Sequence, residues 1–249
     1  MRGDVDDVFR LASISKIITT WTILVAVEEG SIALHTPVGQ PGCTLEHLLS
    51  HAGGYSFDGQ APIAAPGTRR IYSNTGIELA ATAVEQATGI GFATYLGEAI
   101  LEPLAMQTAE LEGSPAHGIW ATIHDVVKLV TEITHPTLLS RESVVSATAV
   151  HFPDLVGMVP GVGTFRPCPW GLGVEIHGRK HPHWMGATNS EATFGHFGGS
   201  GTMLWIDPDA GVSLIALTDR DFDLWASDAL RLWPQLSDAV IAAAGDPAG

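Results

Sequence analysis

The chain has 249 residues, 45% of them hydrophobic and 16% charged, which is enough apolar material for a packed core and excludes a disordered chain. Its 27 acidic and 12 basic residues give a formal net charge of −15, which argues against nucleic acid and anionic membrane surfaces as partners. Two cysteines, Cys43 and Cys168, are too few for a disulfide framework, and two ordinary thiols are favoured over a single bridge.

The first two thirds of the chain have the pattern of helices. Residues 13–30 are apolar on nearly every side and end at Gly30, which suits a helix C-terminus, so we expect a helix buried in the middle of the protein. Its apolar run is shorter than the ~20 residues that span a bilayer, and no membrane span is predicted. Further helices are predicted over residues 75–88, 125–133 and 140–149.

The last third changes to the pattern of strands. Residues 171–177, 202–207 and 212–218 are predicted strands, and the last two flank a Pro-Asp-Ala-Gly turn at 208–211. A closing amphipathic helix is expected over residues 224–244. This order predicts a mixed α/β (α+β) fold, an antiparallel sheet flanked by helices, in a single domain that takes up all 249 residues.

The first candidate for chemistry is Ser13, three residues before Lys16. Residues three apart share a helix face, so the Ser13 hydroxyl and the Lys16 amine can meet. A serine hydroxyl needs a base to take its proton, and a lysine can be that base once burial has lowered its pKa. The alternative is a serine at the helix N-terminus followed by a lysine that reaches solvent, which is favoured for an isolated pair.

The second candidate is the pair Tyr72 and Asn74, directly ahead of the predicted helix over residues 75–88. A phenol held near Lys16 could move protons, and the Asn74 amide could bind a substrate carbonyl or hold Lys16 in place. The alternative is an ordinary helix start with Asn74 as its N-cap.

The third candidate is the glycine-rich segment 194–201, which contains His196, Gly198 and Gly199. Glycines in or beside a strand indicate the close approach of another backbone or a ligand. His196 could bind a carboxylate or acyl group, and a backbone N–H after Gly198 could complete an oxyanion hole. The alternative is a glycine-rich connection with a hydrogen-bonded histidine.

In this order, the motifs Ser13-x-x-Lys16, Tyr72-x-Asn74 and His196-x-Gly198 resemble those of the serine β-lactamase and penicillin-binding protein superfamily. The closest resemblance is to its class C β-lactamase-like branch of esterases and D-alanyl-D-alanine carboxypeptidases. It covers about residues 9–220, and further similar segments are 47–54, 66–68, 102–106 and 170–173. The resemblance implies a β-lactamase/transpeptidase-like fold, with a helical lobe at about 35–165 inserted between the sheet-associated segments.

The resemblance also implies a role for each motif residue. Ser13 is the expected acylated nucleophile and Lys16 its general base, while Tyr72 relays a proton to the leaving group and later activates the deacylating water. The expected binding groups are Asn74, His196, Gly198 and Gly199, with the backbone N–H groups of Ser13 and Gly199 as the oxyanion hole. No metal and no organic cofactor is implied, and the histidine pair at 181 and 183 is interpreted as a solvated loop.

Two departures from the family shape the predicted function. His196 stands where class C β-lactamases usually carry lysine, so a permanently cationic anchor for a β-lactam carboxylate is missing. Only twelve residues precede Ser13, so the family's N-terminal strands are expected to be absent, leaving a sheet edge that a second copy could pair. No signal peptide is recognised, because the first residues are acidic.

The resulting prediction is a serine hydrolase that acts through an acyl-enzyme on a small-molecule ester, amide or lactam, with a carboxylesterase favoured. The alternatives of the same chemistry are D-alanyl-D-alanine carboxypeptidase and β-lactamase activity. The alternative of another class is a catalytically weak, truncated binding or regulatory homologue.

Overall fold

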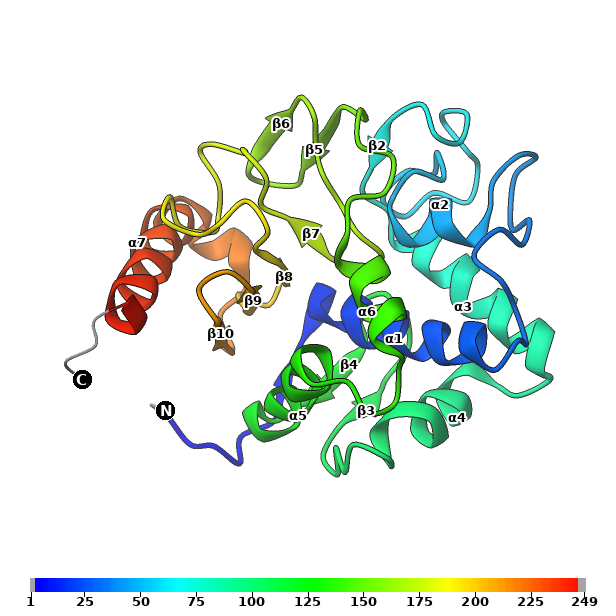
Figure 1. Ribbon diagram of the computed structural model, residues 1–249, viewed down its shortest axis with the longest axis horizontal. Coiled ribbons are helices and arrows are strands. Elements are labelled where there is room, and N and C mark those ends of the chain that lie inside the picture. Colours follow the sequence, from blue (N-terminus) through cyan, green and yellow to red (C-terminus); the bar gives the residue numbers. More distant parts are fainter. Residues whose placement is uncertain (1–2, 246–249) are drawn as a thin grey trace.

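The computed structural model of the protein describes residues 3–245 (Figure 1). Its helices are η1 (Ala12–Ile14), α1 (Ser15–Glu28), α2 (Leu45–Leu49), α3 (Asn74–Thr88), α4 (Phe92–Leu96), η2 (Gly97–Leu101), α5 (Ile123–Thr134), α6 (Arg141–Thr148), η3 (Phe222–Leu224) and α7 (Ala226–Gly245). Its strands are β1 (Phe9–Arg10), β2 (Arg70–Ile71), β3 (Glu110–Leu111), β4 (Ile119–Ala121), β5 (Gly157–Val159), β6 (Gly163–Phe165), β7 (Glu175–Ile176), β8 (Phe194–Phe197), β9 (Met203–Asp207) and β10 (Val212–Ala216).

The largest sheet is antiparallel and has the strand order β10-β9-β8-β7. Its inner strands β8 and β9 are buried along their whole length. Helix α7 packs against this sheet, where the Trp205 indole N–H of β9 donates to Ser237 Oγ over 3.0 Å. Two small sheets, β1-β4-β3 and β2-β5-β6, join segments that are far apart in sequence. The mixed α/β fold predicted from the sequence is confirmed.

Helix α1 runs through the middle of the molecule, with α3 and α4 beside it (Figure 1). Eleven of its 14 residues are buried, including every residue from Ser15 to Leu24. A helix that is apolar on all sides must lie in a core, so the predicted central position is confirmed. Strand β4 is fastened to this helix because the Ile119 N–H donates to Ser15 Oγ over 3.0 Å.

The other predicted helices are present as α3, α5, α6 and α7, with ends shifted by two residues at most. The strand predicted over residues 171–177 is wrong in extent, since only Glu175–Ile176 is a strand. Gly173 adopts a positive φ of 67° that turns the chain, and the Leu172 N–H donates to Ala147 O instead of to a strand. The segment 35–165, expected to be helical, also carries the short strands β2 to β6.

Strand β10 forms one edge of the large sheet, and within residues 3–245 no strand pairs with its outer side. Pairing of this edge with a second copy remains a prediction.

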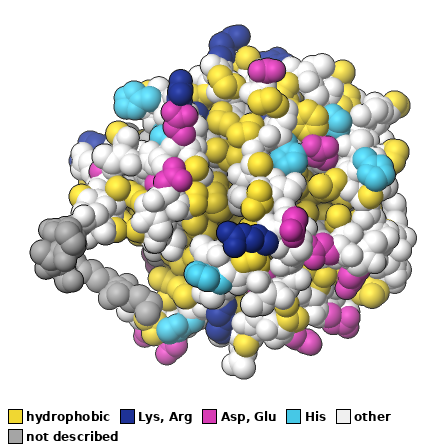
Figure 2. Space-filling view, in the orientation of Figure 1, with side chains coloured by type: hydrophobic (Ala, Val, Ile, Leu, Met, Phe, Trp, Pro, Cys, Tyr) yellow, Lys and Arg dark blue, Asp and Glu magenta, His cyan; other side chains and the backbone are white. Residues whose placement is uncertain are grey.

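Cys43 and Cys168 are both buried free thiols, as the sequence favours. Among the described residues, no helix is long and apolar enough to cross a bilayer. Acidic side chains outnumber basic ones on the face in Figure 2, in line with the net charge.

Candidate active site

Ser13 lies in η1, one turn before α1, in a segment held tightly against the end of β8. The preceding residue, Ala12, has a positive φ of 49°, a strained conformation for a residue with a side chain. A Cβ on Gly198 would lie 2.5 Å from Leu11 O, so only glycine allows this approach of the two backbones. The Thr202 hydroxyl donates to the same Leu11 carbonyl over 2.9 Å. The sequence motif of residues 196–198 is thereby placed directly beside the Ser13 segment.

Lys16 is completely buried, and its Nζ is within hydrogen-bond distance of three oxygens. These are Ser13 Oγ at 3.2 Å, Asn74 Oδ1 at 2.7 Å and Ala116 O at 2.9 Å. Burial lowers the pKa of Lys16 to about 7, although the carboxylates of Asp58 and Glu78 act in the opposite direction. A substantial fraction of the amine is therefore neutral near pH 7.

The three oxygens also fix where the lone pair of a neutral Lys16 points. The Ala116 carbonyl can only accept a hydrogen bond, and so can the Asn74 amide oxygen. A neutral amine has two N–H groups, which these two acceptors occupy. Its lone pair is left for the third neighbour, the Ser13 hydroxyl, which then donates to Nζ. Ala116, which the sequence analysis missed, thus helps to direct the lone pair of a neutral Lys16 at Ser13.

Tyr72 and His196 form a second hydrogen-bonded pair, with Tyr72 Oη 3.3 Å from His196 Nε2. His196 Nδ1 lies 2.6 Å from the carbonyl oxygen of Phe197, which can only accept, so Nδ1 carries the proton and Nε2 accepts from the Tyr72 hydroxyl. Burial lowers the pKa of His196 to about 3, and burial raises the pKa of Tyr72. At neutral pH the pair is a phenol and an uncharged imidazole.

Asn74 is the first residue of α3, and Ser73, not Asn74, is the N-cap. The Asn74 side chain joins two groups, since its Oδ1 accepts from Lys16 and its Nδ2 donates to Asp58 Oδ1 over 2.8 Å. The segment that carries Asp58 is tied to the start of α3, because the Asn74 N–H donates to Phe57 O over 2.8 Å and the Ser73 hydroxyl to Ser56 O over 2.7 Å. Asp58 is a second residue that the sequence analysis missed.

His51, in the similar segment 47–54, lies behind Tyr72 and has the positive φ of 57° of a turn residue. Its Nδ1 accepts from the Ser73 N–H over 3.3 Å, and its carbonyl oxygen accepts from the Ile71 N–H over 2.8 Å. Its ring centroid lies 4.6 Å from that of Tyr72 and 4.7 Å from that of Trp170. His51 therefore fixes the backbone on both sides of Tyr72.

The two glycines after β8, Gly198 and Gly199, differ in whether their backbone N–H group is hydrogen-bonded. The Gly198 N–H donates to Thr202 O over 2.7 Å and is used within the turn. Gly199 is exposed, and no hydrogen bond found among residues 3–245 uses its N–H. Open space surrounds the position where a Cβ would be. Gly199 is thus the better candidate for an oxyanion donor, while Gly198 allows the close approach of the segments.

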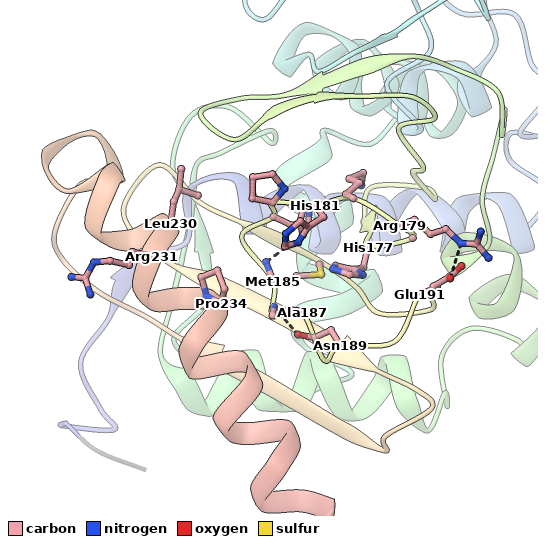
Figure 3. Close-up of a pocket in the computed structure, with 15 residues that line it drawn as sticks. His177, Arg179, His181, Met185, Ala187, Asn189, Glu191, Leu230, Arg231 and Pro234 are labelled. Atoms are coloured by element: carbon pink, nitrogen blue, oxygen red, sulfur yellow. Dashed lines mark hydrogen bonds and ion pairs between the residues drawn. The ribbon is translucent and has the colours of Figure 1, made fainter.

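A separate cavity of about 440 Å³ lies between the β7–β8 connection and α7 (Figure 3). Beside it, the buried Glu175 carboxylate accepts from Lys180 Nζ over 2.7 Å and from the Trp184 indole over 2.8 Å, and it lies 2.8 Å from His183 Nε2. Burial alone would raise the pKa of Glu175, but Lys180 and His183 hold it below its usual range. The interpretation of residues 181–183 as a solvated loop is wrong for His183, which is buried in this network, whereas His181 and Pro182 are exposed. None of the Ser13, Lys16, Tyr72 or Asn74 side chains lines the cavity.

Comparisons with known proteins show which family the chain belongs to. The crystal structure of a beta-lactamase (Mb2281c) from Mycobacterium bovis is 46% identical, covers 98% of this chain and 89% of its own, and superposes with a TM-score of 0.94. A beta-lactamase from Pseudomonas fluorescens is 22% identical over 86% of this chain and 80% of its own length. EstCE1, described as a hydrolase with promiscuous acyltransferase activity, shares the fold with a TM-score of 0.75 at 17% identity, over 96% of this chain and 86% of its own. The Beta-lactamase family matches residues 2–236, and the chain therefore belongs to the beta-lactamase family of serine hydrolases.

Proposed function

We propose that this protein is a carboxylesterase that acts through an acyl-enzyme on Ser13. The observation that carries the proposal is the buried Lys16, 3.2 Å from Ser13 Oγ with a pKa of about 7. A general base works best with a pKa near the working pH, and most lysines are far too basic for this role. The two fixed acceptors around Lys16 direct its lone pair at the hydroxyl.

In the proposed acylation, Lys16 takes the proton of Ser13 while Ser13 Oγ attacks the ester carbonyl carbon. The carbonyl oxygen becomes an oxyanion that the N–H groups of Ser13 and Gly199 stabilise. As the tetrahedral intermediate collapses, the Tyr72 hydroxyl protonates the leaving alkoxide, and the Lys16 ammonium returns a proton to Tyr72. Lys16 Nζ lies 4.8 Å from the centroid of the Tyr72 ring, and this proximity supports the relay.

In the proposed deacylation, a water molecule attacks the acyl-Ser13 carbonyl from the side of Tyr72. The water proton passes through Tyr72 to Lys16, and Ser13 regains its proton when the acyl group leaves as a carboxylic acid. In the resting enzyme His196 Nε2 accepts from the Tyr72 hydroxyl and positions its oxygen, and the single O–H proton turns from His196 to the leaving alkoxide when it is transferred. Because His196 stays neutral, it holds the phenol form of Tyr72 rather than a tyrosinate.

The state of His196 favours an ester over a β-lactam or a D-alanyl peptide, whose carboxylate would need a cationic anchor. The imidazole is 4% exposed, uncharged near pH 7, and hydrogen-bonded at both nitrogens. The structural neighbour EstCE1 is described as a hydrolase with promiscuous acyltransferase activity, which also supports acyl transfer as the proposed chemistry. Carboxypeptidase and β-lactamase activity are the second and third candidates.

The test compares turnover of three substrates by the wild type and by Ser13→Ala: a p-nitrophenyl ester, a D-alanyl-D-alanine peptide and a chromogenic cephalosporin. We expect ester hydrolysis to be fastest and to disappear in Ser13→Ala. Cephalosporin turnover by a protein that leaves the ester intact would overturn the ranking. If the folded wild type turns over none of the three and no serine probe labels it, the non-catalytic alternative holds.

A further inference from the structure

Beside the nucleophile lies an exposed pair of neighbours, Phe57 and Asp58, that the catalytic scheme does not use. The Phe57 side chain is 48% exposed and stacks on Tyr72, with ring centroids 5.8 Å apart and planes 27° apart. The Asp58 carboxylate is connected to Ser13 by three hydrogen bonds, through Asn74 and Lys16. Both side chains are therefore held in place by Tyr72 and Asn74 and are open to solvent.

Two carboxylates near Lys16 have no ion-pair partner when its amine is neutral and reactive. Its carboxylate neighbours are Asp58 and Glu78. The permanent cations of this region are Arg10, whose guanidinium lies 3.2 Å from His117 Nδ1, and the buried Arg70, which acts on His51. The histidines of this region have pKa values lowered by burial and are uncharged at neutral pH: His51, His117 and His196. Neither Asp58 nor Glu78 forms an ion pair among residues 3–245, so a neutral Lys16 leaves both carboxylates without a cationic partner.

An aromatic face next to a carboxylate is the combination that binds organic ammonium groups. The ring attracts a cation through its quadrupole, and the carboxylate adds a direct ion pair. The overall charge of −15 also attracts cationic substrates from a distance. Resting on the proposed esterase function, we infer that Asp58 and Phe57 form a subsite for an ammonium group, and that the preferred substrates are esters whose acyl chain ends in a cation.

The test uses three p-nitrophenyl esters that differ only at the end of the acyl chain. One carries a trimethylammonium group, one the neutral tert-butyl group of the same shape, and one a carboxylate. Each kcat/KM is divided by the rate of hydrolysis of the same ester by hydroxide, which removes differences in intrinsic reactivity. We expect the order cationic, neutral, anionic, with the cationic ester about fivefold above the neutral one.

Variants assign the preference to the subsite. Asp58→Asn and Phe57→Leu should each reduce the cationic-to-neutral ratio towards one. Glu98→Gln removes an exposed charge from η2 and should leave the ratio unchanged, since the preceding α4 is bound at the opposite end of α1 from Lys16, where Tyr95 donates to Glu29. High salt should weaken the preference in the wild type but change little in Asp58→Asn.

The two proposals fail in different ways. Suppose that Ser13→Ala abolishes hydrolysis but the three esters have equal kcat/KM, or that Arg10 gives the anionic ester the highest kcat/KM. The ammonium subsite is then wrong, and the esterase proposal stands. If no ester is hydrolysed, the esterase proposal fails. The subsite is then measured by the rate at which Ser13 is labelled by phosphonate esters with and without a trimethylammonium group. Equal labelling rates, or no labelling, overturn the subsite.

Discussion

Asn74 and Asp58 are joined by a hydrogen bond of 2.8 Å from Nδ2 to Oδ1, and this contact fixes which way the Asn74 amide faces. A carboxylate can accept only from the amide nitrogen, so the amide oxygen must point at Lys16, where it accepts over 2.7 Å. The protonation state of Lys16 is thus linked to the exposed Asp58 carboxylate through the Asn74 side chain.

This link predicts a pH profile that responds to Asp58. Because Lys16 must be neutral to act as base, kcat/KM for a neutral ester should rise as the pH passes through about 7. Asp58 raises the pKa of Lys16, so Asp58→Asn should move this rise to lower pH. Asn74→Asp places a carboxylate against Lys16 and should move it to higher pH, by about one unit or more. Profiles that coincide in all three proteins would show that the rise reports another group.

Substitution of Lys16 measures how much this side chain contributes to kcat/KM. Lys16→Met should lower kcat/KM by about 10² to 10⁴, the range found for general bases. Lys16→Arg keeps a positive charge that cannot be released, so it should be equally inactive. Circular dichroism and thermal unfolding of each variant establish that the fold is kept. Activity of Lys16→Arg near the wild-type level would rule out Lys16 as the base.

The same pKa makes stability depend on pH in a known direction. The pKa of Lys16 falls from 10.5 in the unfolded chain to about 7 in the folded protein, so between these values the unfolded state binds more protons. Burying the charged Lys16 lowers the free energy of unfolding by its full amount below pH 7, and this loss disappears as the pH approaches 10.5. Urea unfolding should therefore show the wild type gaining stability relative to Lys16→Met over this window. Parallel curves would contradict the lowered pKa.

Tyr72 is predicted to act on both half-reactions. Tyr72→Phe keeps the ring that stacks on Phe57 and His51 but removes the hydroxyl that donates to His196. We expect kcat to fall about 10²-fold or more. Rapid-quench measurement of the released alcohol should show a slower burst and slower turnover. Wild-type kcat in Tyr72→Phe would remove Tyr72 from the proton path.

The network around Glu175 is predicted to stabilise the fold rather than to take part in the reaction. Glu175→Gln leaves the buried Lys180 without its carboxylate partner, and breaking such a pair costs about 3–5 kcal/mol. Urea unfolding should show this loss, while kcat/KM of the folded protein stays near the wild-type value. A large fall in kcat/KM with unchanged stability would instead connect this network to the reaction.

The sequence predicted the parts of the fold that depend on local pattern. The buried α1 follows from an apolar run with no polar side, and β9 and β10 follow from strand patterns around a turn. The strand predicted around Gly173 was wrong because glycine there serves a left-handed turn, which an apolar pattern does not reveal. The two-residue strands are too short to show any periodicity.

The candidate site was predictable where a motif fixes the spacing, and not where long-range packing supplies a group. Ser13 and Lys16 meet because they are three residues apart, and the structure brings Asn74 to the same amine from 58 residues away. Ala116 contributes only a backbone oxygen, so its side chain carries no signal. Asp58 has an ordinary acidic side chain in a loop, and its position depends on hydrogen bonds to the start of α3.

The most direct test of the account is the site of covalent modification. The wild type is incubated with a fluorophosphonate probe, digested and analysed by mass spectrometry, alongside Ser13→Ala and, as a matched control, Ser200→Ala. We predict one added probe on the peptide that contains Ser13 in the wild type and in Ser200→Ala, and none in Ser13→Ala. Labelling that persists in Ser13→Ala, or a folded wild type that takes up no probe, would contradict Ser13 as the nucleophile.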